Sequence, residues 1–133
     1  MAVTFEEMKE VVKLDPFLKL FDFRVVSSRI GEVVLECDLR DHLLRIGGTM
    51  NGGAIMSLLD AAGGLCILTK EDVLNQVTSS LSINFLRPIS KGPVRTRGKL
   101  IKGGRNLAYT QIEVMDGDGK LAASAMGTWF LFR

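Results

Sequence analysis

Apolar residues fill one segment of the chain almost completely, and they alternate with polar residues through much of the rest. The filled segment covers residues 54–68 and is interrupted by Ser57, Asp60 and a pair of glycines. A segment that is apolar on nearly every side predicts a helix enclosed by the rest of the protein. We expect this helix to begin after Asn51, whose side chain can cap it, and to end near Lys70.

Alternating segments on both sides of this helix predict strands. Residues 23–30 and 32–39 alternate around Gly31, which we expect to be the turn of a hairpin. Four more alternating runs follow the helix, separated by clusters of Gly, Pro, Asn and Asp, and predict antiparallel strands. These runs cover residues 77–86, 94–101, 107–115 and 121–132. Near the start, Thr4 and Glu7 form a capping-box pattern, which predicts a short helix ending near Leu14.

These elements predict an α+β fold in which a sheet of about six antiparallel strands curls around the long helix, because that arrangement covers an apolar helix economically. The chain has 133 residues, of which 47% are hydrophobic and 24% charged, so we expect a single domain over residues 1–133. Gly63 and Gly64 each cost about 1 kcal/mol relative to Ala in a helix. Their presence predicts that another backbone, from the sheet or a dimer partner, passes close to them.

Composition excludes several classes of function. The apolar segment is shorter than the roughly 18 to 20 residues of a membrane span, and a net charge of +2 gives no argument for nucleic acid. The first residues carry Glu6, Glu7 and Glu10 and lack the pattern of a secretory signal. We therefore expect a cytoplasmic protein that binds neither membrane nor nucleic acid.

The small number of thiol and imidazole side chains limits the possible catalytic chemistry further. Cys37 and Cys66 have no ligand-type spacing and are expected to be buried thiols, so no metal site is predicted. His42 is the only histidine, lies in a loop and is expected to be structural. Without a Ser-His-Asp triad, catalysis would rely on a carboxylate, a hydroxyl or a backbone amide.

Asp60 is the strongest catalytic candidate, because an unpaired carboxylate in a dry core is expensive. The alternative is that Asp60 bonds structural partners or opens onto water. Gly52 and Gly53 lie in the first helical turn, where free amides and the helix dipole can stabilise an oxyanion. Gly52 lies eight positions before Asp60, or about 12 Å along a helix, so one carbonyl cannot contact both. We therefore predict that Asp60 of one subunit faces Gly52 of another across an isologous homodimer interface.

Two segments resemble the hotdog-fold acyl-CoA thioesterases of the phenylacetate-degradation type. They are LRIGGTMNGGAI at residues 44–55, followed by Asp60, and SINFLRP at residues 82–88. Family members typically show a Gly-x-x-His-Gly-Gly loop, an Asp nine positions after that His, and a later Asn-Phe-Leu-x-Pro-like sequence. The likeness covers about residues 20–132 and implies a hotdog fold and generally paired subunits. Apolar residues on both faces of residues 121–132 extend this expectation to a tetramer.

The resemblance implies hydrolysis of an acyl-CoA thioester, with Asp60 as general base or nucleophile and no cofactor, since coenzyme A is part of the substrate. Asn51 stands where the family usually has the His that supports the loop. Arg45 stands where many members have an Asn that positions the water or the thioester. Thr78 stands where relatives often carry a hydroxyl near the acid; a strand Thr present for its β propensity is the alternative.

The resemblance also implies contacts to coenzyme A. The candidates are Gly53, Arg87, Lys102, Gly103, Gly104, Arg105 and Asn106, of which the last four form a turn similar to the family's Gly-Arg-rich phosphate contact. Arg95, Arg97 and Lys99 alternate along one strand and therefore share one side, which suits phosphates or simply faces solvent.

Two other functions remain open on the same fold. One is a non-catalytic protein that binds or senses an acyl-CoA or lipid ligand. The other is a dehydratase or hydratase, against which the absence of His near the central helix argues.

Overall fold

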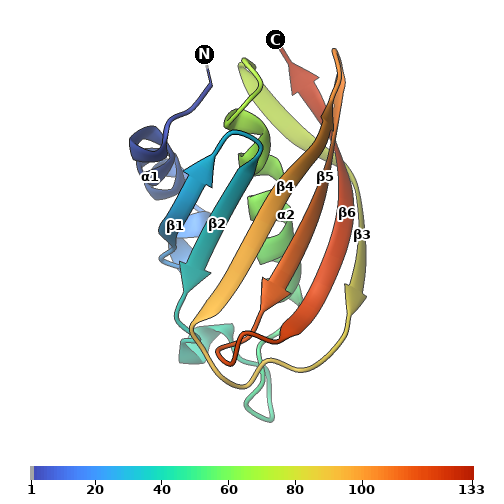
Figure 1. Ribbon diagram of the computed structural model, residues 1–133. Helices are drawn as coiled ribbons and strands as arrows, with labels where there is room; N and C mark the ends of the chain where they lie inside the picture. The colour runs from blue at the N-terminus through green and yellow to red at the C-terminus, as the bar shows by residue number, and fades with distance from the viewer. Residues whose placement is uncertain (1) are drawn as a thin grey trace.

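The computed structural model describes residues 2–133, in which a six-stranded antiparallel sheet curls around a long helix (Figure 1). The helices are α1 (Phe5–Leu14) and α2 (Gly52–Leu68), with short 3₁₀ turns at Leu18–Leu20 and Asp41–Leu43. The strands are β1 (Arg24–Arg29), β2 (Glu32–Cys37), β3 (Asn75–Phe85), β4 (Val94–Gly103), β5 (Leu107–Met115) and β6 (Leu121–Phe132). The α+β class and the curled sheet around a central helix are confirmed.

The strand order is β1-β2-β4-β5-β6-β3, and every neighbouring pair is antiparallel. β3 follows α2 directly in the chain, yet it pairs with β6 at the far side of the sheet rather than with β4. β1 and β3 are therefore the two edges. The sequence predicted the strands, but this order depends on contacts between distant segments.

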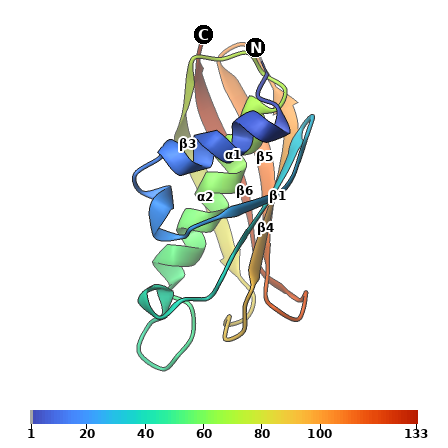
Figure 2. The same ribbon diagram turned by 90° about the vertical axis from the view of Figure 1, so that its left-hand side faces the viewer.

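Local signals fix the ends of the first elements as predicted. The Thr4 hydroxyl accepts a hydrogen bond from the Glu7 amide at 3.2 Å, and the Glu7 carboxylate accepts one from the Thr4 amide at 3.1 Å. Gly31, with a φ of 81°, makes the turn between β1 and β2. α1 lies on the same side of the sheet as α2 (Figure 2) and buries Met8 and Val12 in the same core.

α2 is enclosed over its C-terminal half, as its composition predicted, whereas its first turns keep one face partly open at Gly53, Ser57 and Asp60. Its buried residues are Ile55, Leu58, Leu59, Ala61, Ala62, Gly63, Gly64, Leu65, Cys66 and Ile67. None of the helices within residues 2–133 has the length and apolar character needed to cross a bilayer. Cys37 and Cys66 are buried free thiols, and burial raises the pKa of Cys37 to about 11 and that of Cys66 further still. Neither thiol is therefore a ready nucleophile.

The nearest neighbour of the helical glycines is a side chain, and the predicted backbone passes beside Gly63 as well. A Cβ on Gly63 would lie 2.9 Å from Cζ2 of Trp129 and closer still to Cη2, and one on Gly64 would lie 3.0 Å from its Nε1. The passing backbone is that of β4, where a Cβ on Gly98 would overlap the carbonyl of Ala62 and lie 3.2 Å from the Gly63 nitrogen. The buried indole thus occupies the space that larger residues at these helix positions would fill.

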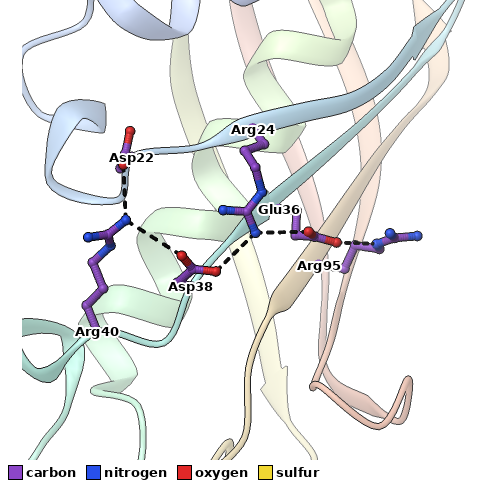
Figure 3. Close-up of polar contacts among 6 residues, drawn as sticks. All are labelled: Asp22, Arg24, Glu36, Asp38, Arg40 and Arg95. Atoms are coloured by element: carbon purple, nitrogen blue, oxygen red, sulfur yellow. Dashed lines mark hydrogen bonds and ion pairs between the residues drawn. The ribbon is translucent and has the colours of Figure 1, made fainter.

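A chain of ion pairs joins β1, β2 and β4 to the neighbouring loops (Figure 3). Its members, in order, are Asp22, Arg40, Asp38, Arg24, Glu36 and Arg95. Hydrogen bonds from Arg24 and then Arg95 hold the pKa of the Glu36 carboxyl below its usual range. Each exposed pair contributes little alone. Together, however, the charges protect the β1 edge, and charged edges discourage pairing with another chain.

We expect Gly63→Ala to lower the free energy of unfolding by about 1 to 2 kcal/mol. The overpacking cost of about 1 to 3 kcal/mol against Trp129 exceeds the gain of up to about 1 kcal/mol in helix propensity. Gly52→Ala is the matched control, because a Cβ there meets no atom within 4 Å. Urea unfolding of both variants tests this, and equal midpoints would contradict the packing argument.

Candidate active site

The first turn of α2 is closed by the side chain of Asn51. Its Oδ1 accepts hydrogen bonds from the amides of Gly53 at 2.7 Å and Ala54 at 3.3 Å, which confirms the predicted N-cap. Within residues 2–133, no group accepts a hydrogen bond from the Gly52 amide. One donor with positive helix-dipole character therefore remains available at this helix end.

The two glycines differ in the space around them. A Cβ on Gly52 would meet no atom within 4 Å, whereas one on Gly53 would lie 2.9 Å from the capping oxygen of Asn51. The Gly53 amide is also occupied by that cap. Of the two predicted glycines, only Gly52 therefore combines a free amide with open space.

Asp60 lies in the middle of α2 and contacts Thr78 of β3. The Thr78 hydroxyl donates a hydrogen bond to Oδ1 of Asp60 at 2.5 Å. The structure thus brings together the acid and the hydroxyl named from the family resemblance. Within residues 2–133 no hydrogen bond reaches the second carboxylate oxygen, which is therefore available to a water or a substrate atom.

Asp60 is only half-buried in the isolated subunit, which corrects the expectation of an acid inside a dry core. Gly53, Ser57 and Asp60 lie three or four residues apart and share one helix face, and all three are partly or fully exposed. The sheet covers the opposite face of α2, and its edge strand β3 reaches only to the side of Asp60. A second surface is needed to bury this acid.

Gly52 and Asp60 belong to one uninterrupted helix, so their separation follows from helix geometry. The eight-residue interval corresponds to about 12 Å along the axis. An oxyanion donor and a base must each lie within about 3 Å of the atoms they serve. A single subunit therefore does not bring the two together around one carbonyl.

The loop at residues 44–50 projects beyond the start of α2 (Figure 1), and a bridge between Leu44 and Met50 closes it around Arg45. The Arg45 amide donates to the Thr49 carbonyl at 2.8 Å, and the Arg45 carbonyl accepts from Gly48 at 3.1 Å. Among the described residues, no carboxylate pairs with its guanidinium, and the neighbouring Ile46 is 94% exposed. Arg45 is thus a free cation at the same end of the molecule as Gly52.

The turn of Gly103, Gly104, Arg105 and Asn106 connects β4 to β5 at the opposite end of α2. Arg133 holds it by donating to the carbonyls of Gly104 at 2.9 Å and Arg105 at 3.0 Å, and it also pairs with Glu71 just after α2. The side chains of Lys102 and Arg105 are exposed. In one subunit, the predicted phosphate contacts and Gly52 are therefore separated by the length of the helix.

The remaining predicted cations have varied surroundings. Arg87 follows β3 and pairs with the buried Asp116 at 3.7 Å. Arg95, Arg97 and Lys99 share the outer side of β4 as predicted, and all are exposed. Arg95 is paired with Glu36, which leaves Arg97 and Lys99 as the freer charges on this strand.

Sequence reasoning missed the residues that neighbour the start of α2 from the N-terminal side. Phe17 and Leu20 line a cavity with Asn51 and Gly53, and His42 bonds the Leu20 carbonyl through Nε2 at 2.7 Å. His42 is therefore structural, as expected. The available signal was the pair of apolar residues in a short segment between a helix and a strand.

Comparisons with known proteins point to one family. A family model described as "Thioesterase superfamily" matches residues 47–123. A "putative esterase" of Thermoplasma acidophilum is 39% identical over 96% of this chain and 97% of its own length. Human acyl-coenzyme A thioesterase 13 is 24% identical over 92% of this chain and 93% of its own. The structure of a mutant of the phenylacetic acid degradation protein PaaI from Thermus thermophilus is 31% identical, with a TM-score of 0.78 over 87% of this chain and 98% of that one.

We expect Asn51→Ala to lower the free energy of unfolding by about 1 kcal/mol, because it removes the acceptor for two helix amides. Asn51→Asp retains that acceptor and is expected to be as stable as the native protein. Denaturant unfolding at neutral pH measures both variants. If both variants lose the same free energy of unfolding, the helix cap does not explain the contribution of Asn51 to stability.

Proposed function

The chain belongs to the thioesterase superfamily, and on that premise we propose that it hydrolyses an acyl-CoA thioester to the free acid and coenzyme A. The observation that carries the proposal is the unbonded Gly52 amide at a capped helix N-terminus, a donor suited to a thioester oxyanion. The name of the human relative, an acyl-coenzyme A thioesterase, supports the choice of substrate.

The chemistry follows from the two groups. Asp60 accepts a proton from water as the water oxygen attacks the thioester carbon, and the Gly52 amide donates to the resulting oxyanion. The tetrahedral intermediate then collapses, the carbon–sulfur bond breaks, and the coenzyme A thiolate takes up the proton. In the alternative route, Asp60 attacks directly and water hydrolyses the mixed anhydride. In both routes the Thr78 hydroxyl orients the carboxylate through Oδ1.

The reacting groups come from two subunits in this proposal. β3 is an unprotected edge of eleven residues, and edge strands present unpaired amides and carbonyls to a second chain. Asp60 lies against this strand through Thr78. Met56 on α2 and Phe85 on β3 are 43% and 52% exposed and would be covered by such a partner. Pairing two copies through β3 therefore buries Asp60 and gives two equivalent sites.

An antiparallel arrangement of two α2 helices also explains the distant phosphate contacts. If Asp60 lies beside the partner's Gly52, the end of α2 at Leu68 extends past the start of the partner's α2, toward the loop at residues 44–50 that precedes it. The Gly103–Asn106 turn then approaches the partner's Arg45 loop. Free cations from both subunits would face the same coenzyme A phosphates, as charge-assisted phosphate binding requires.

The outer face of the sheet supports a further pairing of dimers into a tetramer. Met126 and Phe130 of β6 are 52% and 42% exposed, and Tyr109 on β5 is 39% exposed. Apolar side chains gathered on one face of a sheet mark an interaction surface. This second contact lies away from Asp60 and adds nothing to the chemistry proposed above.

We expect Gly52→Pro to lower kcat by about 100- to 1,000-fold, because it deletes the proposed oxyanion donor. Proline is tolerated at the first helical position, and the φ and ψ of Asn51, −59° and 134°, suit a residue before proline. Gly52→Ala keeps the amide and is the matched control. Release of free thiol from a panel of acyl-CoAs gives the readout. Native protein that binds acyl-CoA saturably without releasing thiol would favour the non-catalytic alternative, which Asn51 at the family's His position keeps open.

We expect a mixture of two inactive variants, Asp60→Asn and Gly52→Pro, to regain activity after subunit exchange. A mixed dimer holds one intact site, formed by Gly52 of one subunit and Asp60 of the other. Random exchange of equal amounts gives about a quarter of native activity. Thiol release before and after exchange measures this, and no recovery despite demonstrated mixed dimers would overturn the pairing of Asp60 with the partner's Gly52.

A further inference from the structure

A cavity of about 440 Å³ lies between the Leu18–Leu20 turn and the first turns of α2. Its apolar walls are Phe17, Leu20, Phe21 and Leu44, and α2 contributes Ala54 and Ser57. His42, Asn51 and Ser57 add polar groups, and the lining, all of it within residues 2–133, contains no Asp, Glu, Lys or Arg. The cavity therefore suits an uncharged, largely apolar group.

The wall opposite α2 is held in place by specific contacts. Oδ1 of Asp15 accepts hydrogen bonds from the amides of Phe17 at 3.0 Å and Leu18 at 3.1 Å. The Phe17 ring packs edge-on against buried Phe21 with centroids 5.9 Å apart. Even so, Phe17 and Leu20 remain 55% and 53% exposed. The fold thus fixes two large apolar side chains around a space that they do not fill.

This cavity adjoins the helix end that carries the free amide. Asn51 and Gly53, the residues on either side of Gly52, both belong to its lining. Gly53 and Ser57 also share a helix face with Asp60, which lies one turn beyond Ser57. A thioester whose carbonyl oxygen accepts from Gly52 therefore lies next to the mouth of this cavity.

We propose that the cavity binds the acyl chain of the substrate in the subunit whose Gly52 contacts the carbonyl, and that Phe17 and Leu20 set acyl specificity. The inference rests on the proposed thioesterase function and adds the substrate class. A volume near the lower end of the roughly 300 to 1,000 Å³ of small-molecule sites fits medium-chain or aryl acyl groups. Acetyl groups leave it unfilled.

The test compares Leu20→Ser with Leu14→Ser. Leu14 ends α1, is 76% exposed and lies outside the cavity lining, so it is a matched control. Calorimetry with S-octyl-coenzyme A, a thioether that cannot be hydrolysed, and with coenzyme A gives a ratio of affinities. Each methylene buried is expected to raise affinity about fourfold. Leu20→Ser should lower the ratio about five- to tenfold, and Leu14→Ser should leave it unchanged.

Turnover of octanoyl-CoA and acetyl-CoA separates the two proposals. A native protein that hydrolyses neither, yet binds the octyl chain in a Leu20-dependent way, retains the cavity assignment and loses the enzyme function. A native protein that hydrolyses acyl-CoA with equal chain selectivity in both leucine variants retains the function and overturns the cavity assignment. If S-octyl-coenzyme A binds no more tightly than coenzyme A, the cavity assignment is also overturned.

Discussion

The packing of α2 against Trp129 determines where Gly52 and Asp60, the two proposed reacting groups, lie. The indole is 2% exposed and occupies the volume beside Gly63 and Gly64, while Gly98 lets β4 approach the backbone of Ala62. Close-packed interiors resist changes even of a methylene, so these contacts fix the helix along its axis and in rotation. That rotation leaves the face with Gly53, Ser57 and Asp60 outside the curl of the sheet.

The Gly52 amide and the Asp60 carboxylate are carried on one rigid helix and cannot approach each other. The proposed chemistry therefore requires a second subunit. The positive field of a helix N-terminus falls off within its first turn, so Asp60 gains little from the end of its own helix. In the proposed dimer it instead faces the N-terminus of the partner's helix. The contact between the Asp60 carboxylate and the positive end of the partner's helix would therefore also stabilise the dimer electrostatically.

Features that depend on neighbouring residues were predictable from the sequence. The capping box at Thr4, the turn at Gly31 and the cap at Asn51 all involve groups within a few residues, and β5 and β6 have the predicted ends. Thr78 was placed near Asp60 through the family resemblance, and the structure shows that contact. The edge position of β3, the packing of Trp129 against α2 and the cavity at Leu20 join distant segments, which periodicity alone does not report.

Asn51 is compatible with the proposed chemistry because its side chain can bond only certain amides of the first helical turn. The side chain of an N-cap residue accepts from the second or third helical amide, and Asn51 bonds those of Gly53 and Ala54. The first helical amide, on Gly52, lies outside its reach. Asn51 therefore caps the helix without consuming the proposed oxyanion donor. By fixing the first turn, the cap also holds that donor in the preorganised position from which such a group is most effective.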